Sequence, residues 1–340
     1  MKSNYRYIVK AFMAMAVIAG TTSCDDFLDR EPMSSISPET YYSTAAQLEA
    51  NLNDEYPNVL PSFGQWTYGI FGEDKGTDNQ IEVNANDRYT QDRWKVPHSE
   101  SDNWKFERIY RINFFLSEAL PKFGEDMSGS QNTISGSVAT IKHYIGEMYF
   151  LRAYEYFKKL QLFGDFPIIN QPLADEMEAL REASKRFPRN EVARFIISDL
   201  DKAYAYMSDV DMATTRINKD AAMLVKSRVA LFEATWLQNF KGTAFVPGGE
   251  GWPGASLHNN YQYPSGNLDN EVKYFLEQAV EASKLVADKY KGNLTENTGV
   301  LQQSADDPSN PYFDMFAQED LSDVKEVLLW RQYARGLSTH

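Results

Sequence analysis

The sequence predicts a mostly all-α protein built of paired helices with long irregular loops between them. The first observation is the stretch Gly146 to Ile169, whose apolar and aromatic residues recur every three or four positions and so form one stripe of a helix. Gly164 lies where a left-handed residue ends many helices, and Pro167 follows where the helix can no longer continue. Further aromatic residues flank the stripe, so we expect this central helix to pack against neighbours on more than one side.

The second observation is that the same periodicity continues along the chain. It predicts helices over Trp104–Leu120, Ser137–Phe163, Asn190–Met207, Asn218–Phe240 and Leu268–Tyr290. Asn190 and Asn218 are the predicted N-caps, because an Asn side chain can accept from the first free backbone N–H groups. The stripe predicted to be buried in the fourth helix consists of Ala221, Leu224, Val225, Arg228, Leu231, Phe232 and Trp236.

These helices are expected to form two antiparallel pairs. Ser137–Phe163 pairs with Asn190–Met207, and Asn218–Phe240 pairs with Leu268–Tyr290. The pairs resemble tetratricopeptide-like helix-turn-helix units, although the 34-residue signature of those repeats is not spelled out.

The N-terminus is predicted to be an export signal. Lys2, Arg6 and Lys10 precede a short apolar run over residues 11–20, which is too short to span a bilayer, since a span needs about 20 residues. The lone cysteine of the chain, Cys24, follows this run after Thr21, Thr22 and Ser23 and cannot form an internal disulfide. We therefore interpret residues 1–23 as a lipoprotein signal peptide and Cys24 as the lipidation site.

The charge of the chain argues against nucleic acid as a partner. The formal net charge is −14, and removal of residues 1–23 takes away three basic residues and no acidic one. A surface this acidic repels phosphate backbones.

Two loops are predicted to carry the binding site. Residues 24–103 form a loop-rich part, with a short helix that starts at Ser37 and Pro38 and buries Leu48 and Leu52, followed by a long loop from Pro61 to Ser101. A second loop, rich in Gly, Pro and aromatic residues, separates the last two helices and is expected to be exposed.

The aromatic residues of these loops are the candidate ligand contacts. Sugar rings present apolar C–H faces and a rim of hydroxyl groups, so their sites need flat aromatic platforms with amide or carboxylate groups nearby. The alternative is that each ring folds back as an anchor of its own loop. The candidates are Trp66, Tyr68, Asp78, Asn79, Tyr89 and Trp94 in the first loop and Trp252, Tyr261 and Tyr263 in the second.

Catalytic, metal and cofactor sites find little support. The four histidines are isolated from one another, the glycines around Gly249 lack the Lys-Ser/Thr of a phosphate loop, and Asp209 with Asp211 lacks the remainder of a calcium loop. If the protein were a glycosidase, Asp74 and Asp78 would be the candidate catalytic carboxylates. Helical pairs such as Asp199 with Asp201 are instead expected to be solvated. We predict no enzyme activity, no cofactor and no bound metal.

Several segments resemble the SusD/RagB family. They are the lipoprotein cysteine followed by DDFLDREP, FLRAYEYFKKLQLFGDFPII from Phe150, RNEVARFIISDLDKA from Arg189, INKDAAMLVKSRVALFEA from Ile217 and FDMFAQEDLSDVKEVLLWRQY from Phe313. Their order and spread over nearly the whole chain identify it as a member. The resemblance implies one SusD-like domain over residues 24–340, with a helical tetratricopeptide-like part over 104–292 and a tail over 293–340.

The resemblance also implies a function and a partner. Such proteins are surface-exposed outer-membrane lipoproteins of Bacteroidetes-type bacteria, which capture an oligosaccharide or another nutrient and pass it to a SusC-like TonB-dependent transporter without cleaving it. A surface glycosidase and a transporter lid without ligand selectivity remain the alternatives. Family members usually continue past the segment after Phe313 into a C-terminal part with further ligand contacts, which this chain is expected to lack.

Overall fold

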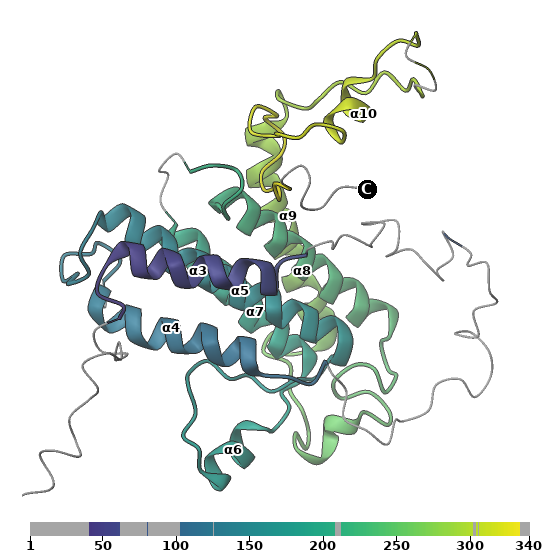
Figure 1. Ribbon diagram of the computed structural model, residues 1–340. Helices are drawn as coiled ribbons and strands as arrows, with labels where there is room; N and C mark the ends of the chain where they lie inside the picture. Colours follow the sequence, from purple (N-terminus) through teal and green to yellow (C-terminus); the bar gives the residue numbers. More distant parts are fainter. Residues whose placement is uncertain are drawn as a thin grey trace, which may run out of the picture. The chain divides into compact units, whose positions relative to one another are not determined.

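The computed structural model describes residues 41–61, 80, 103–124, 126–207, 212–301, 304 and 306–333, and it shows a mostly helical protein there (Figure 1). The contacts divide the chain after Tyr41, and the fold is that of residues 42–340. Within the described residues the β-structure is limited to isolated bridges. The predicted fold class is therefore confirmed. The helices are α3 (Ala45–Val59), α4 (Glu107–Phe123), α5 (Val138–Phe163), α6 (Met177–Ala183), α7 (Arg189–Tyr206), α8 (Lys219–Asn239), η3 (Pro253–Ser256), α9 (Leu268–Tyr290) and α10 (Pro311–Met315).

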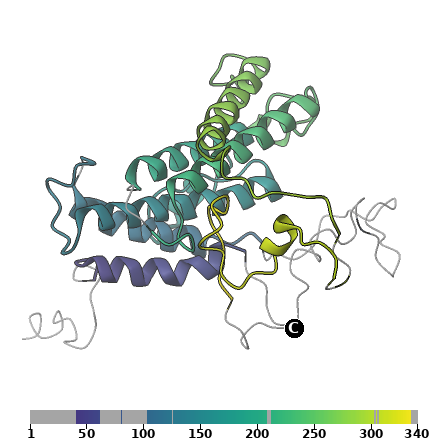
Figure 2. The same cartoon turned by 90° about the horizontal axis from the view of Figure 1, so that it is seen from above.

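The central helix α5 agrees closely with its sequence prediction. Ser137 caps its start by accepting from the backbone N–H of Thr140, and Gly164 ends it at a φ of +66°, a value that favours glycine. α3, α4 and α7 all pack on α5 (Figure 2). Contact on these sides buries most of the helix, including most of its apolar stripe and of the flanking aromatic residues, while Tyr154 and Phe163 are half-buried. A residue at 146 has to be small, because a Cβ there would lie 2.8 Å from the backbone nitrogen of Met207 on the neighbouring segment.

The two predicted helix pairs are both present. α5 packs against α7, α8 packs against α9, and α7 also packs against α8, so the pairs stack side by side. Asn218 caps α8 by accepting from the backbone N–H of Ala221, as predicted. Pairing of consecutive helices in this way is typical of tetratricopeptide-like folds.

Two predicted N-caps are wrong, and the helix predicted to start at Trp104 begins at Glu107. The helix that buries Leu48 and Leu52 begins at Ala45 and not at Ser37, because Thr44 and Gln47 form a capping box in which each side chain accepts from the other residue's backbone. α7 begins one residue before Asn190, which lies inside the helix and is buried. The Asn190 side chain donates to Glu271 at 3.0 Å instead of capping the helix.

The buried face of α8 also differs from the prediction. Leu224 and Leu231 are 41% and 51% exposed. Ala221 is buried as predicted, and the helix otherwise buries a face of mainly small and ion-paired residues, namely Asp220, Ala222, Met223, Lys226, Val229, Ala230, Glu233, Ala234 and Leu237. Close helix packing admits alanine, and Lys226 and Glu233 have ionic partners at Asp201 and Arg189. Hydrophobicity alone therefore identified the wrong stripe.

Buried ion pairs join the helices to one another. Arg152 on α5 binds Asp199 on α7, Arg189 on α7 binds Glu233 on α8, and Arg194 on α7 binds Glu271 on α9. Asp199 is fully buried, so its expected place on a solvated helical face is wrong.

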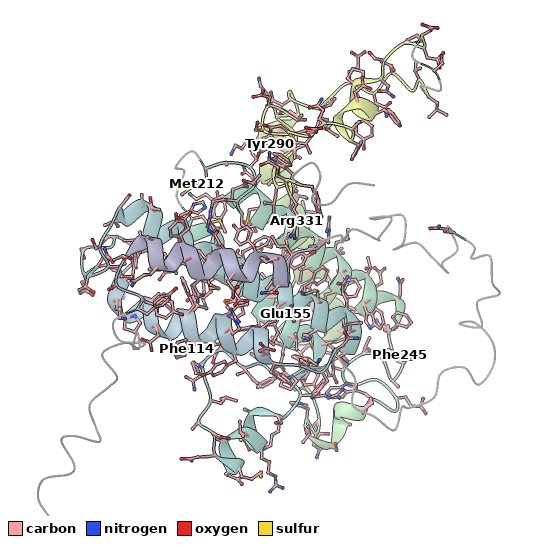
Figure 3. The ribbon with its side chains drawn as sticks, in the orientation of Figure 1. Phe114, Glu155, Met212, Phe245, Tyr290 and Arg331 are labelled. Atoms are coloured by element: carbon pink, nitrogen blue, oxygen red, sulfur yellow. The ribbon has the colours of Figure 1, made fainter. Side chains whose placement is uncertain are left out.

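The tail returns to the helices over residues 328–331. The backbone N–H of Trp330 donates to the carbonyl oxygen of Thr214, and Arg331, labelled in Figure 3, donates to the carbonyl oxygen of Pro61 at 3.3 Å. Among the described residues, no helix combines the length and the apolar character that crossing a membrane requires.

Candidate functional site

Three connections leave the helices at the same end. α3 runs parallel to α5, because Thr44 pairs with Ser135 at its start and the carbonyl oxygen of Val59 accepts from Lys158 at its end. α4 runs antiparallel to α5, since the next residue along, Lys159, donates to the carbonyl oxygen of Asn103 just before α4. Three connections therefore start and finish at the same end of the helices. They are the connection between Pro61 and Asn103, the α5–α7 connection and the α8–α9 connection. We call this part of the molecule the loop end.

Val59 and Asn103, described residues on either side of residues 62–102, are held on a single turn of α5. Lys158 reaches Val59 at 3.0 Å and Lys159 reaches Asn103 at 2.7 Å. Glu155, labelled in Figure 3, lies 2.5 Å from the ammonium of Lys158 and 3.3 Å from that of Lys159. The Glu155 carboxylate thus holds both lysines in place. Through these lysines, the central helix sets the distance between Val59 and Asn103.

The first-loop candidates Trp66, Tyr68, Asp78, Asn79, Tyr89 and Trp94 lie outside the described residues, as do Cys24 and the pairs Asp74 with Asp78 and Asp209 with Asp211. They stay predictions. The structure shows where the chain enters and leaves their segment, at the loop end.

The second-loop candidates are described, and all three point back into the protein. Trp252 is only 5% exposed, and its indole N–H donates to the Asp165 carboxylate at 2.8 Å. Tyr261 exchanges hydrogen bonds with Asn190, and the Tyr263 hydroxyl donates to the carbonyl oxygen of Pro247. Burial raises the pKa of both tyrosine hydroxyls. In this arrangement the three rings serve as anchors of their loop, which was the alternative that the sequence left open.

The pKa values of the three carboxylates beneath this loop are shifted in different directions. Burial raises the pKa of Asp165 and of Glu233 above the usual range, against the opposing effect of their hydrogen-bond and ionic partners. Burial also acts to raise the pKa of Glu271, but hydrogen bonds from Arg194, Asn190 and Ser265 outweigh it and hold that pKa below the usual value. All three groups are occupied by partners within the chain: Asp165 and Glu271 each bind both the loop and α7, and Glu233 binds Arg189 of α7.

An aromatic cluster that the sequence did not single out lies at the same end. The Trp104 ring lies 4.9 Å from Phe163 and from Phe166 and 5.6 Å from Phe106, measured between ring centroids. The Arg186 guanidinium lies over the Trp104 ring, 4.6 Å from its centroid. These residues come from three distant segments, and no sequence spacing predicts that they meet.

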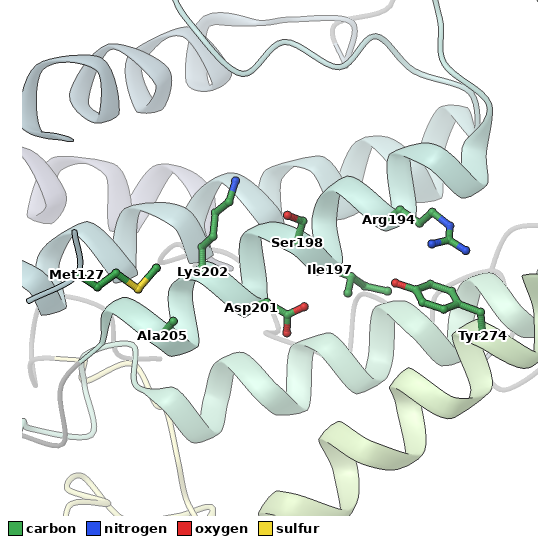
Figure 4. Close-up of a pocket in the computed structure, with 8 residues that line it drawn as sticks. All are labelled: Met127, Arg194, Ile197, Ser198, Asp201, Lys202, Ala205 and Tyr274. Carbon is green, nitrogen blue, oxygen red and sulfur yellow. The ribbon is translucent and has the colours of Figure 1, made fainter. Parts of the chain in front are cut away.

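A shallow pocket of about 340 Å³ lies on the outer face of α7 (Figure 4). It is lined by six α7 residues, by Met127 and by Tyr274 of α9. Its charged groups are paired within the chain, Arg194 with Glu271, Asp201 with Lys226 and Lys202 with Asp199. The pocket therefore offers no free charge to a ligand.

The comparisons with known proteins bear on the whole arrangement. The model of a SusD-like family, described as starch-binding and associating with the outer membrane, matches residues 26–231. The chain belongs to this SusD-like family.

Curated relatives and solved structures carry the same family name. SusD-like proteins P25 and P2 of Formosa agariphila are each 25% identical to the chain, over 63% and 71% of it and over 41% and 46% of their own lengths. The chain thus spans less than half the length of these two relatives. A SusD-like protein of Bacteroides fragilis is similar in structure at 21% identity with a TM-score of 0.43, covering 62% of this chain and 39% of that one. NanU of B. fragilis is similar at 17% identity with a TM-score of 0.47, covering 90% of this chain and 51% of its own.

The matched part of this SusD-like chain includes the aromatic cluster and both ends of residues 62–102. It stops within α8, so the second aromatic loop and α9 lie beyond it. The family match therefore covers the scaffold and the first loop, whereas the second loop is described by this structure alone.

Proposed function

We propose that the protein is a cell-surface lipoprotein that binds an oligosaccharide and delivers it to a SusC-like TonB-dependent transporter, without cleaving it. Membership of the SusD-like family supports the general role. One observation carries the assignment of the site: the two aromatic loops singled out in the sequence both leave the helices at the loop end.

A site of this construction suits glycan capture. The helix pairs are tied together by buried ion pairs, so they form a firm base for loops whose side chains vary with the ligand. Aromatic faces stack on the C–H faces of a sugar, while neighbouring amide and carboxylate groups receive its hydroxyl groups. Such an arrangement binds a sugar without a nucleophile or a general acid, which is why we propose a binding protein and not a hydrolase.

Attachment to the outer membrane is proposed to occur through Cys24. The cysteine follows a basic and then apolar N-terminal segment, as lipoprotein signals do. Replacing Cys24 by Ser should release the protein from the membrane fraction while leaving its fold intact. Retention of the Cys24→Ser protein in membranes after a high-salt wash would contradict the lipid anchor.

Calorimetry against a panel of plant, microbial and host glycans tests the binding function. The soluble form that starts after Cys24 should bind at least one of them, and Trp66→Ala and Trp94→Ala should weaken that binding. Phe316→Ala is the matched control, because Phe316 is a 70% exposed aromatic residue of the tail that is not in either loop. Absence of binding by both the soluble and the full-length form would overturn the proposal.

An uptake assay in cells that carry the cognate transporter distinguishes the proposed role from that of a transporter lid without ligand selectivity. If the protein selects the ligand, Trp66→Ala with Trp94→Ala should reduce uptake of the bound glycan. Unchanged uptake would favour the lid. Release of reducing sugar that Asp74→Asn abolishes would favour a glycosidase.

A further inference from the structure

The guanidinium of Arg186 is held in a fixed position at the loop end. The next residue, Phe187, pairs with Phe166 through two backbone hydrogen bonds of 3.1 and 3.2 Å. The carbonyl oxygen of Arg186 itself lies 2.8 Å from Nε2 of His258. With its backbone fixed on both sides, Arg186 places its guanidinium over the Trp104 ring. Stacking of this kind reduces the freedom that an arginine loses on binding a ligand.

The side-chain N–H groups of Arg186 have no hydrogen-bond partner among the described residues. Buried or half-buried arginines at the helix junctions are ion-paired, as Arg152, Arg189 and Arg194 show. Among the described residues, no carboxylate forms an ion pair with Arg186, although its side chain is exposed. Asp165, whose charge interacts with Arg186, is already occupied by Trp252 and by the backbone N–H of Arg189.

The indole N–H of Trp104, the ring beneath this guanidinium, has no acceptor among the described residues. Of the four tryptophans that the structure describes, three donate their indole N–H: Trp236 to the carbonyl oxygen of Phe245, Trp252 to Asp165 and Trp330 to Thr214. Trp104 has no hydrogen-bond partner among the described residues, although the ring is half-buried. A half-buried indole usually finds an acceptor, so an acceptor from a ligand would complete the site.

We propose that Arg186 and Trp104 form a subsite for the carboxylate of an acidic sugar. The planar guanidinium matches a carboxylate in a bidentate geometry, and the indole N–H supplies a further donor beside it. Partly exposed rings of Phe106 and Phe163 form an apolar border on which the sugar ring rests. The inference rests on the proposed glycan-binding function and names the ligand class for part of the loop end.

The acidic surface of the protein does not oppose this choice. At physiological ionic strength, charges farther apart than about 8 Å are largely screened. The charge nearest the ligand is therefore that of Arg186, and the Asp165 carboxylate, which also interacts with Arg186, is engaged by Trp252 and by the backbone N–H of Arg189. A neutral sugar would leave the strongest donor of the subsite without a charged acceptor.

Calorimetry with two versions of one oligosaccharide tests the subsite. An oligogalacturonide should bind at least about tenfold more tightly than its methyl ester, in which a methyl group replaces the negative charge. Arg186→Gln should remove this preference, and Trp104→Phe should weaken binding of the acid several-fold while keeping a ring beneath the guanidinium. Arg181→Gln is the control, since Arg181 is likewise exposed and unpaired among the described residues but has no ring beneath it.

The outcomes distinguish this inference from the proposed function. Equal binding of acid and ester, or a preference that survives Arg186→Gln, would overturn the subsite while glycan binding stands. Binding of an acidic peptide in place of the oligosaccharide would overturn it as well. If the oligogalacturonide does not bind, the subsite is refuted, and the glycan panel alone decides the proposed function.

Discussion

Arg152 and Asp199 form a bidentate ion pair in the interior, with hydrogen bonds of 2.6 Å from Nε and 2.8 Å from Nη2 to the two carboxylate oxygens. The pair joins the two helices of the first repeat, α5 and α7. A third nitrogen of Arg152 donates to Asn113 on α4 and to the carbonyl oxygen of Asn170. One guanidinium thus fixes three helices and the chain that leaves α5 for the loop end.

Removing one partner of this pair should be strongly destabilising. Asp199→Ala leaves the Arg152 guanidinium buried without its counter-charge, and we expect the free energy of unfolding to fall by about 3–5 kcal/mol. The exposed pair of Lys284 with Asp288 provides the control, because solvent screens this pair and Asp288→Ala should leave the free energy of unfolding almost unchanged. Urea denaturation followed by circular dichroism measures both. A loss below about 1 kcal/mol for Asp199→Ala would contradict the central role of the pair.

Gly146 is predicted to set the distance between α5 and α7. A Cβ at this position would lie 2.7 Å from Met207 Cγ and 2.9 Å from the carbonyl oxygen of Ala203, so the helices must separate to admit it. Gly146→Ala should therefore destabilise the protein by about 1–3 kcal/mol, although alanine favours a helix. Gly292→Ala should have no such effect, since no atom lies within 4 Å of a Cβ there. Equal melting temperatures for the two variants would show that the contact relaxes without cost.

The sequence predicted the helices of this fold well where the chain follows local rules. Periodicity and a glycine stop located α5, and Asn218 was recognised as a cap. The capping box of Thr44 and Gln47 is equally local, and it was missed because Ser37 followed by Pro38 also matches a helix start. Signals of this kind depend only on neighbouring residues.

Features that depend on distant partners could not be predicted. Asn190 has the side chain of an N-cap, but Glu271, far away in the sequence, draws it into the interior. The α8 face follows from partners of Lys226 and Glu233 that become neighbours only after folding. For the same reason, the sequence alone did not predict the stacking of Arg186 on Trp104 or the anchoring of Trp252 by Asp165.

α5 is predicted to be a scaffold and not a ligand contact. Leu160 is 1% exposed, and its replacement by Ala should cost about 2–5 kcal/mol, whereas Leu160→Asp should prevent folding. Leu162, two residues later on the same helix, is 58% exposed, so Leu162→Ala should change stability by at most about 0.5 kcal/mol. Chemical denaturation compares the two alanine variants. A stable Leu160→Asp protein with normal secondary structure would refute the assignment of this helix to the core.

Glu271 should make the stability of the protein depend on acid. Its carboxylate is buried, and burial acts to raise its pKa, but the donors Arg194, Asn190 and Ser265 hold the pKa below the usual glutamate value of 4.5. A pKa lowered by folding contributes stability that is complete above the unfolded-state value and is lost as the pH falls through the folded-state value. The contribution of Glu271 should thus be present at neutral pH and disappear below a pH of about 4.5.

Glu271→Gln isolates this contribution, because glutamine keeps the size of the side chain and cannot titrate. The variant should be less stable than the original protein at neutral pH, and the difference should shrink as the pH falls from about 5 to about 3. Burial shifts the pKa of Glu233 in the opposite direction, upward. The stability difference between Glu233→Gln and the original protein should therefore not shrink as the pH falls. Urea denaturation of the three proteins across this range measures the difference. The contrary outcome is a difference in the free energy of unfolding between Glu271→Gln and the original protein that stays constant with pH. That outcome would show that the carboxylate acts through its shape and hydrogen bonds, and not through its charge.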